Sequence, residues 1–221
     1  MDVVFTEKDA LFRMTADELA RITVNENGAT VHPRITYGDA PAHDAHSILV
    51  GSGVPQGMAR FLRAYPDGGL LRVSARPGLV RTGELRRLVD SGALGPRQIA
   101  LFGTRAWSAD ELAFASSKGV QCYSMLEISR EGLAEMTDAV MAYARLWSTF
   151  HLVIDLDALD PAFAPGLRAQ SPGGLSSREL FYLVQRLRLI RTLASVEIIA
   201  AVDVADASTA ALLARLLAEL Q

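Results

Sequence analysis

Short apolar runs alternate along the chain with segments whose apolar residues recur at helical spacing. The runs are rich in branched aliphatic and aromatic residues and end in turn residues, which predicts strands. The predicted strands cover residues 47–51, 70–75, 98–102, 120–124, 150–157 and 196–204. The run His151-Leu152-Val153-Ile154 is apolar almost throughout, which is typical of a strand buried on both faces of a parallel sheet.

The amphipathic segments between these runs predict helices. They cover residues 55–64, 84–91 and 109–118, a stretch that follows a capping box at Ser176, and a last helix from about residue 207. Ser108 and Gly119 are expected to cap the third of these helices at its two ends. Strands that alternate with helices predict a three-layer α/β/α domain with a mainly parallel, doubly wound sheet. The carboxyl ends of its strands then share one edge, where ligands of such folds bind.

Residues 1–46 show a less regular pattern, and we expect an irregular or truncated region there, either an antiparallel edge or a partly separate flap. With 221 residues, half of them apolar, the chain is long enough for one well-packed core. We therefore expect a single domain over residues 1–221.

Charge and composition exclude several classes of function. The net charge is -3 and the charged residues are interspersed, so the one-sided basic surface that nucleic acid requires is not expected. Arg186, Arg188 and Arg191 cluster, but a solvated helix face explains them. No stretch approaches the ~20 apolar residues that span a bilayer.

The single cysteine and the first residues bear on the compartment. Cys122 is the only cysteine, which rules out an intrachain disulfide and a cysteine zinc cluster, and we expect it to be a small core residue. The first residues carry no basic segment followed by an apolar one, so no secretory signal is indicated. We expect a cytoplasmic protein.

The most informative segment is the end of the predicted strand 150–157. Asp155, Asp157 and Asp160 follow an apolar run, and the period of two places the first two on the same side of the strand. Two adjacent carboxylates near a core repel unless a cation lies between them, which points to a hard divalent ion such as Mn²⁺ or Mg²⁺. The alternative is that these aspartates cap the following turn, and the residues alone favour neither.

The same segment resembles a known family signature. Residues 155–166, with Pro172-Gly173-Gly174-Leu175 behind them, are similar to the pattern Ser-x-Asp-x-Asp-x-x-Asp-Pro-x-x-Ala-Pro-Gly and the Pro-Gly-Gly-Leu that follows it in ureohydrolases, the superfamily of arginase, agmatinase and formiminoglutamase. The order of elements upstream is also similar, so the resemblance extends over about residues 49–204. It implies an arginase-like fold.

The resemblance also implies a chemistry. Ureohydrolases carry a bridged two-metal centre, usually of manganese, whose hydroxide attacks the carbon of a guanidinium or amidine group. The ligands come from a Gly-Gly-Asp-His motif, an Asp-Ala-His-x-Asp motif and the two-aspartate motif. Asp155 and Asp157 match the last of these and are the retained metal-ligand positions.

The other two motifs are not retained. Val54 stands at the histidine position of the first, and Ser74, Arg76 and Gly78 replace the ligands of the second. The family's substrate-facing glutamate falls on Ala200. Arg76 would bring a permanent positive charge into the vacated site and could pair with either aspartate in place of a metal.

Other histidines could supply ligands. His43, Asp44 and His46 form a loop segment that could reach a cation, although a polar surface loop is the favoured interpretation. His32 is expected on an exposed strand, and His151 is expected to be a hydrogen-bonded core histidine.

Three hypotheses follow. The preferred one is a degenerate, non-catalytic ureohydrolase-family protein without a cofactor, acting as a structural, regulatory or ligand-binding subunit. Family analogy implies self-association as a trimer or hexamer, or a hetero-oligomer with an active relative. The alternative is a divergent metal-dependent hydrolase of a guanidine- or amidine-type C–N bond, with Mn²⁺ held by the aspartates and a loop histidine. The third is a small-molecule binding module. Enzymes of the family usually carry a further βα unit before the strand of the Gly-Gly-Asp-His motif. Here an irregular segment, residues 1–46, precedes that strand, so we expect part of the active-site wall to be missing, which disfavours the enzyme.

Overall fold

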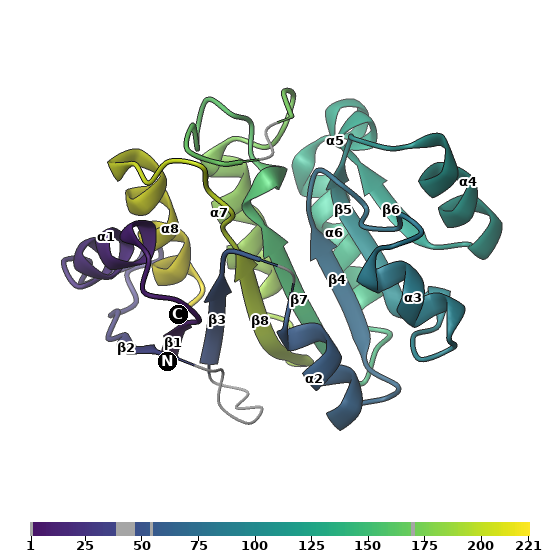
Figure 1. The fold of residues 1–221 in the computed structure, drawn as a ribbon, viewed down its shortest axis with the longest axis horizontal. Helices are drawn as coiled ribbons and strands as arrows, with labels where there is room; N and C mark the ends of the chain where they lie inside the picture. The colour runs from purple at the N-terminus through teal and green to yellow at the C-terminus, as the bar shows by residue number, and fades with distance from the viewer. Residues whose placement is uncertain (1, 39–46, 54, 169–170) are drawn as a thin grey trace.

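The computed structural model describes residues 2–38, 47–53, 55–168 and 171–221. These residues form an eight-stranded sheet with helices on both faces (Figure 1). The strands are β1 (Asp2–Phe5), β2 (Arg34–Tyr37), β3 (Ser47–Gly51), β4 (Gly69–Val73), β5 (Ile99–Thr104), β6 (Gln121–Ser124), β7 (Phe150–Asp155) and β8 (Leu193–Ile199). Their order across the sheet is β2-β1-β3-β8-β7-β4-β5-β6, and every pairing is parallel. The predicted doubly wound α/β fold is confirmed.

The helices divide between the two faces of the sheet. They are α1 (Ala10–Leu19), α2 (Gly57–Ala64), α3 (Glu84–Asp90), α4 (Ala109–Lys118), α5 (Met125–Glu131), α6 (Leu133–Ala144), α7 (Ser177–Leu187) and α8 (Ala207–Glu219). The apolar residues of α2, α3 and α4 form one core with one face of the sheet, and those of α1 and α5–α8 form a second core with the other face. Consecutive side chains of β7 therefore point to opposite faces of the sheet: Leu152 and Ile154 belong to the second core and Val153 to the first.

Several predicted boundaries hold. The strand 47–51 and the helix 109–118 coincide with β3 and α4, and Ser108 and Gly119 cap α4 as expected. The predicted strand 150–157 is too long, because β7 ends at Asp155 and a single 3₁₀ turn, Leu156–Ala158, follows. None of the described helices is long and apolar enough to cross a membrane.

The prediction for residues 1–46 is wrong in the described part, residues 2–38. These residues form β1, α1 and β2, and β1 pairs in parallel with both β2 and β3, so this edge of the described sheet is parallel. Asp9 caps α1 through its carboxylate, which accepts a hydrogen bond from the Phe12 N–H. A βα unit therefore precedes β3, contrary to the expectation that this part of the wall is missing.

A buried polar group fixes α2 to the sheet. His151 is 2 % exposed, and its ring nitrogens contact Ser195 Oγ at 2.7 Å and Glu197 Oε2 at 3.3 Å. The Glu197 carboxylate also accepts hydrogen bonds from the backbone N–H groups of Gln56 and Gly57, where α2 begins. His151 is thus a core histidine, as predicted. His32 is exposed, but it precedes β2 instead of lying in a strand.

The contact between β4 and the indole of Trp147 gives a stability prediction. A Cβ at Gly69 would lie 1.9 Å from Trp147 Cδ2, and the indole is held by its hydrogen bond to the Arg97 carbonyl. We expect Gly69→Ala to lower the free energy of unfolding by about 1–3 kcal/mol, measured by urea denaturation. Gly53→Ala is the control, because a Cβ there meets no atom within 4 Å. Equal stability of the two variants would contradict this packing.

Candidate functional site

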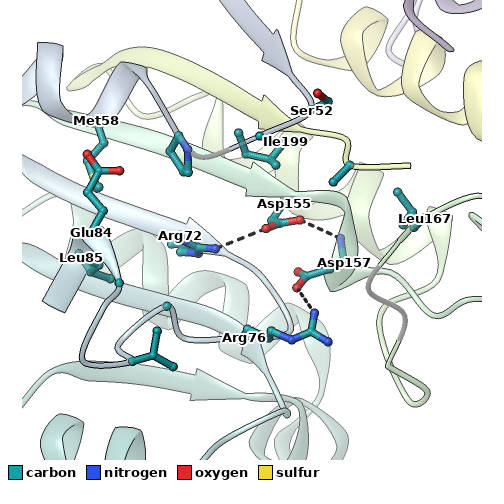
Figure 2. Close-up of a pocket in the computed structure, with 16 residues that line it drawn as sticks. Ser52, Met58, Arg72, Arg76, Glu84, Leu85, Asp155, Asp157, Leu167 and Ile199 are labelled. Carbon is teal, nitrogen blue, oxygen red and sulfur yellow. Dashed lines mark hydrogen bonds and ion pairs between the residues drawn. The ribbon is translucent and has the colours of Figure 1, made fainter. Parts of the chain in front are cut away.

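A pocket of about 390 Å³ lies at the carboxyl ends of the central strands β8, β7 and β4 (Figure 2). Its wall includes Met58 from α2, Glu84 and Leu85 from α3, and the charged residues Arg72, Arg76, Asp155 and Asp157. The pocket therefore lies where the parallel fold is expected to hold a ligand. It also contains the two aspartates and the arginine that the sequence selected.

Asp155 is the last residue of β7, and each of its carboxylate oxygens has a partner. Its Oδ1 accepts a hydrogen bond from the backbone N–H of Asp157 at 3.2 Å, and its Oδ2 lies 3.4 Å from Nη2 of Arg72 on the adjacent strand β4. The first contact is the turn-capping bond that the sequence left open. Burial and the neighbouring Asp157 raise the pKa of Asp155 to about 6, while Arg72 opposes this shift.

Asp157 follows in the 3₁₀ turn and accepts more hydrogen bonds. Its Oδ1 accepts from Ser74 Oγ at 3.0 Å and from the backbone N–H of Ala75 at 2.8 Å, while its Oδ2 lies 3.2 Å from Arg76 Nη1. The Asp157 side chain is 9 % exposed, whereas that of Arg76 is 44 % exposed. The carboxylate is thus held mainly by the segment after β4, with Arg76 closing the pair from the solvent side.

These contacts decide whether the residues fit a divalent metal. Each of the four carboxylate oxygens of Asp155 and Asp157 already accepts a hydrogen bond or ion pair from the protein. Two of the donors are guanidinium groups, which are permanently charged and would repel a cation in this position. No group of three or more potential metal-ligating side chains occurs within the described ranges. The donor set around the two aspartates therefore does not fit a two-metal centre.

The remaining family positions provide no replacement ligands. Ser74 is engaged with Asp157, Gly78 has no side chain, and Ala200, the residue after β8, is fully buried with its N–H bound to the Gly51 carbonyl. Val54 and the candidate loop residues His43, Asp44 and His46 lie outside the described residues.

Arg105 is a functional position that the sequence reasoning missed. Its guanidinium donates hydrogen bonds to the backbone carbonyls of Asp157, Ala158, Leu159, Ser171 and Pro172, at 2.6–3.2 Å. It thus ties the turn after β7 to the segment before α7. The only sequence signal was an arginine directly after the strand that ends in Gly103-Thr104.

Asp160 and Gly174 complete this backbone clamp. Asp160 accepts hydrogen bonds from the N–H groups of Ala162 and Gly173, and these bonds lower its pKa. A Cβ at Gly174 would lie 2.6 Å from the Ala158 carbonyl oxygen, so only glycine allows the two segments to approach this closely. The Asp-Pro and Gly-Gly parts of the signature therefore serve backbone packing.

Arg72 and Glu84 were also missed. Arg72 Nε and Glu84 Oε2 are buried and have no hydrogen-bond partner among the described residues. Burial, with Glu197 nearby, raises the pKa of Glu84. Both side chains line the pocket, so they are polar groups that a bound molecule could satisfy.

Comparison with known proteins places this geometry in context. The sequence model described as "Arginase family" matches residues 74–221. The arginase of Bacillus caldovelox is 32% identical over 110 residues, which cover 49% of this chain and 37% of that protein. The arginase of Glaciozyma antarctica is 25% identical over 180 residues, which cover 69% of this chain and 51% of that protein. The matched segment thus spans about a third to a half of these curated relatives.

Solved structures share the fold over nearly the whole chain. The arginase structure from Bacillus caldovelox has a TM-score of 0.81 at 17% identity and covers 99% of this chain and 97% of that one. Proclavaminate amidino hydrolase from Streptomyces clavuligerus has a TM-score of 0.81 at 18% identity, with 99% and 89% covered. At these identities the likeness shows the fold alone.

The unequal exposure of the Arg76–Asp157 pair gives a prediction. Asp157→Ala removes the acceptor of Ser74 Oγ and of the Ala75 N–H together with the partner of Arg76, so we expect a loss of about 2–4 kcal/mol in the free energy of unfolding. Arg76→Gln should cost less than about 1 kcal/mol, because its side chain is partly solvated. Urea denaturation at neutral pH measures both. Equal losses would show that the ion pair, and not the buried hydrogen bonds, dominates.

Proposed function

The chain belongs to the arginase family, and we propose that it is a non-catalytic member in which two arginine–aspartate pairs occupy the place of the metal centre. The observation that carries this proposal is the pairing of Asp155 with Arg72 and of Asp157 with Arg76. The ureohydrolase mechanism needs a metal-activated hydroxide. The groups around Asp155 and Asp157 do not fit the two metal ions that would supply it.

The charge balance of the cluster supports the proposal. Two carboxylates at the end of a buried strand normally require a cation, and two guanidinium groups meet this requirement. Adding a divalent ion would leave the cluster with excess positive charge and would require both arginines to move. Arginine keeps its charge over the whole physiological pH range, whereas a histidine in the same place would lose its charge near neutral pH.

The role that remains for such a protein is structural, regulatory or ligand-binding. A pocket lies beside the charge cluster, and its Arg72 Nε and Glu84 Oε2, which have no hydrogen-bond partner in the described part of the chain, are suited to hold a small polar molecule. Self-association as a trimer or hexamer, or assembly with an active relative, is proposed by analogy with the family. Light scattering after gel filtration measures the first of these.

The competing function is a metal-dependent hydrolase of a guanidine- or amidine-type C–N bond with a reduced site. It would use Asp155 and Asp157 with His43 or His46, and the arginines would have to turn away from the carboxylates. Its support is the retention of two carboxylates side by side in a pocket.

Metal content separates the two functions. The purified chain is incubated with Mn²⁺, desalted, and analysed for bound metal, and product release from arginine, agmatine and formiminoglutamate is then assayed. We expect no retained metal and no turnover, because the carboxylate oxygens are engaged by protein donors. An active arginase, treated in parallel, is the positive control.

A double variant, Asp155→Asn with Asp157→Asn, is the matched negative control. Metal that it still retains does not come from this site. Stoichiometric metal in the wild-type chain that disappears in the double variant would overturn the replacement of the metal centre. Turnover that also depends on the two aspartates would establish the hydrolase instead.

A further inference from the structure

A second and larger groove, of about 730 Å³, lies beside β6, which is an edge strand of the described sheet. Its wall is built from the carboxyl end of β5, from β6 along its length, and from α4 and α5, which lie at the right of Figure 1. No residue of this wall lines the pocket that holds Asp155 and Asp157. Its volume is in the range of small-molecule sites, and it lies at the ligand-binding edge of the fold.

A buried hydroxyl in the wall lacks a partner. Thr104 is 1 % exposed, and its Oγ1 has no hydrogen-bond partner among the described residues. The β5–β6 register shifts between Phe102 and Thr104, and Gly103 between them adopts a φ of 77°. Such a bulge turns a side chain away from its regular direction and is common beside binding sites. A buried, unsatisfied hydroxyl is costly, so a group in the groove that bonds to it gains affinity.

The rest of the wall is largely apolar. Trp107 lies at one side, and Leu112 and Leu126 flank the groove although they are 53 % and 59 % exposed. Large apolar side chains left in solvent around a concave surface indicate a binding site. The indole offers a flat face against which a planar ring can stack.

Among the charged groups of the wall, one exposed arginine can pair with an anion. Arg105 is committed to five backbone carbonyls, and Glu127 caps α5 by accepting from Ser124. Arg130 is exposed and forms no ion pair within the described chain, so it is the available charge. Burial raises the pKa of the Cys122 thiol to about 11, so this side chain adds no charge at neutral pH.

We propose that this groove binds a small planar aromatic carboxylate, with its ring against Trp107 and the flanking leucines, its carboxylate at Arg130 and a polar ring substituent or carboxylate oxygen at Thr104. The site is independent of the function proposed for the aspartate pocket. It combines an apolar wall with two convergent polar groups, which is the general composition of small-molecule sites.

Calorimetric titration of the full chain with 2-naphthoate tests the site. We expect one molecule bound per chain, and weaker binding of neutral 2-naphthalenemethanol because it cannot pair with Arg130. Thr104→Val should weaken 2-naphthoate about 3- to 10-fold, the equivalent of one lost hydrogen bond, whereas Thr104→Ser should retain the affinity. The melting temperature of unliganded Thr104→Val should be equal to or above that of the wild type, because the orphan hydroxyl is gone.

Arg130→Gln should weaken 2-naphthoate by a similar factor and remove the preference for the acid over the alcohol. Arg191→Gln is the matched control, since Arg191 is an exposed arginine in the loop before the central strand β8, at the amino ends of the strands, and does not line the groove. The proposal is overturned by the absence of binding at millimolar concentration, or by binding that Thr104→Val and Arg130→Gln leave unchanged. It is equally overturned if Arg191→Gln weakens binding as much as Arg130→Gln. Because Arg130 is exposed, its variant remains informative if Thr104→Val fails to fold.

Discussion

Two carboxylates placed side by side at the end of a buried strand must be compensated, and the centre of this molecule is arranged around that requirement. Asp155 and Asp157 lose water as β7 enters the core, and each buried ion costs several kcal/mol unless donors replace the water. Here the donors are Arg72 on β4, Arg76 just after it, and the Ser74–Ala75 segment between them. The pairing of β4 with β7 therefore fixes the charge compensation as well as the hydrogen-bonded ladder. Asp155 receives fewer hydrogen bonds than Asp157, and burial beside the Asp157 carboxylate raises its pKa in spite of Arg72.

Backbone packing around the two aspartates explains why the family signature is retained in part. Asp160, Gly173 and Gly174 hold the turn after β7 against the segment before α7, and Arg105 locks both with five carbonyl contacts. These residues act on the backbone and are needed whether or not a metal is bound. Ser74 and Arg76, at two of the ligand positions, instead hold the Asp157 carboxylate, and Gly78 adopts a φ of 72° that favours glycine. A signature of this kind can thus be maintained by packing as well as by chemistry.

Sequence reasoning succeeded where the signal was local. The strand 47–51 is marked by its apolar run, and the helix 109–118 by its apolar spacing and its capping residues. The two aspartates are marked by their spacing at the end of an apolar run. It failed for β1, which is only four residues long and becomes a strand by pairing with β2 and β3 from distant parts of the sequence. It also missed Arg72, which stands in an apolar run and meets its partner Asp155 83 residues away. Contacts of this kind are set by sheet order, which periodicity does not encode.

The clamp also separates the two concave surfaces at the carboxyl edge of the sheet. Arg105 lines the groove beside β6, while its guanidinium holds the backbone carbonyl of Asp157, whose side chain lines the other pocket. An arginine with five carbonyl partners cannot shift without breaking several hydrogen bonds at once. Both surfaces therefore border the same rigid clamp, and a ligand in either one meets groups that are already in place. Preorganisation of this kind lowers the entropic cost of binding. We therefore expect this rigid edge to be the part of the fold best suited to bind a ligand.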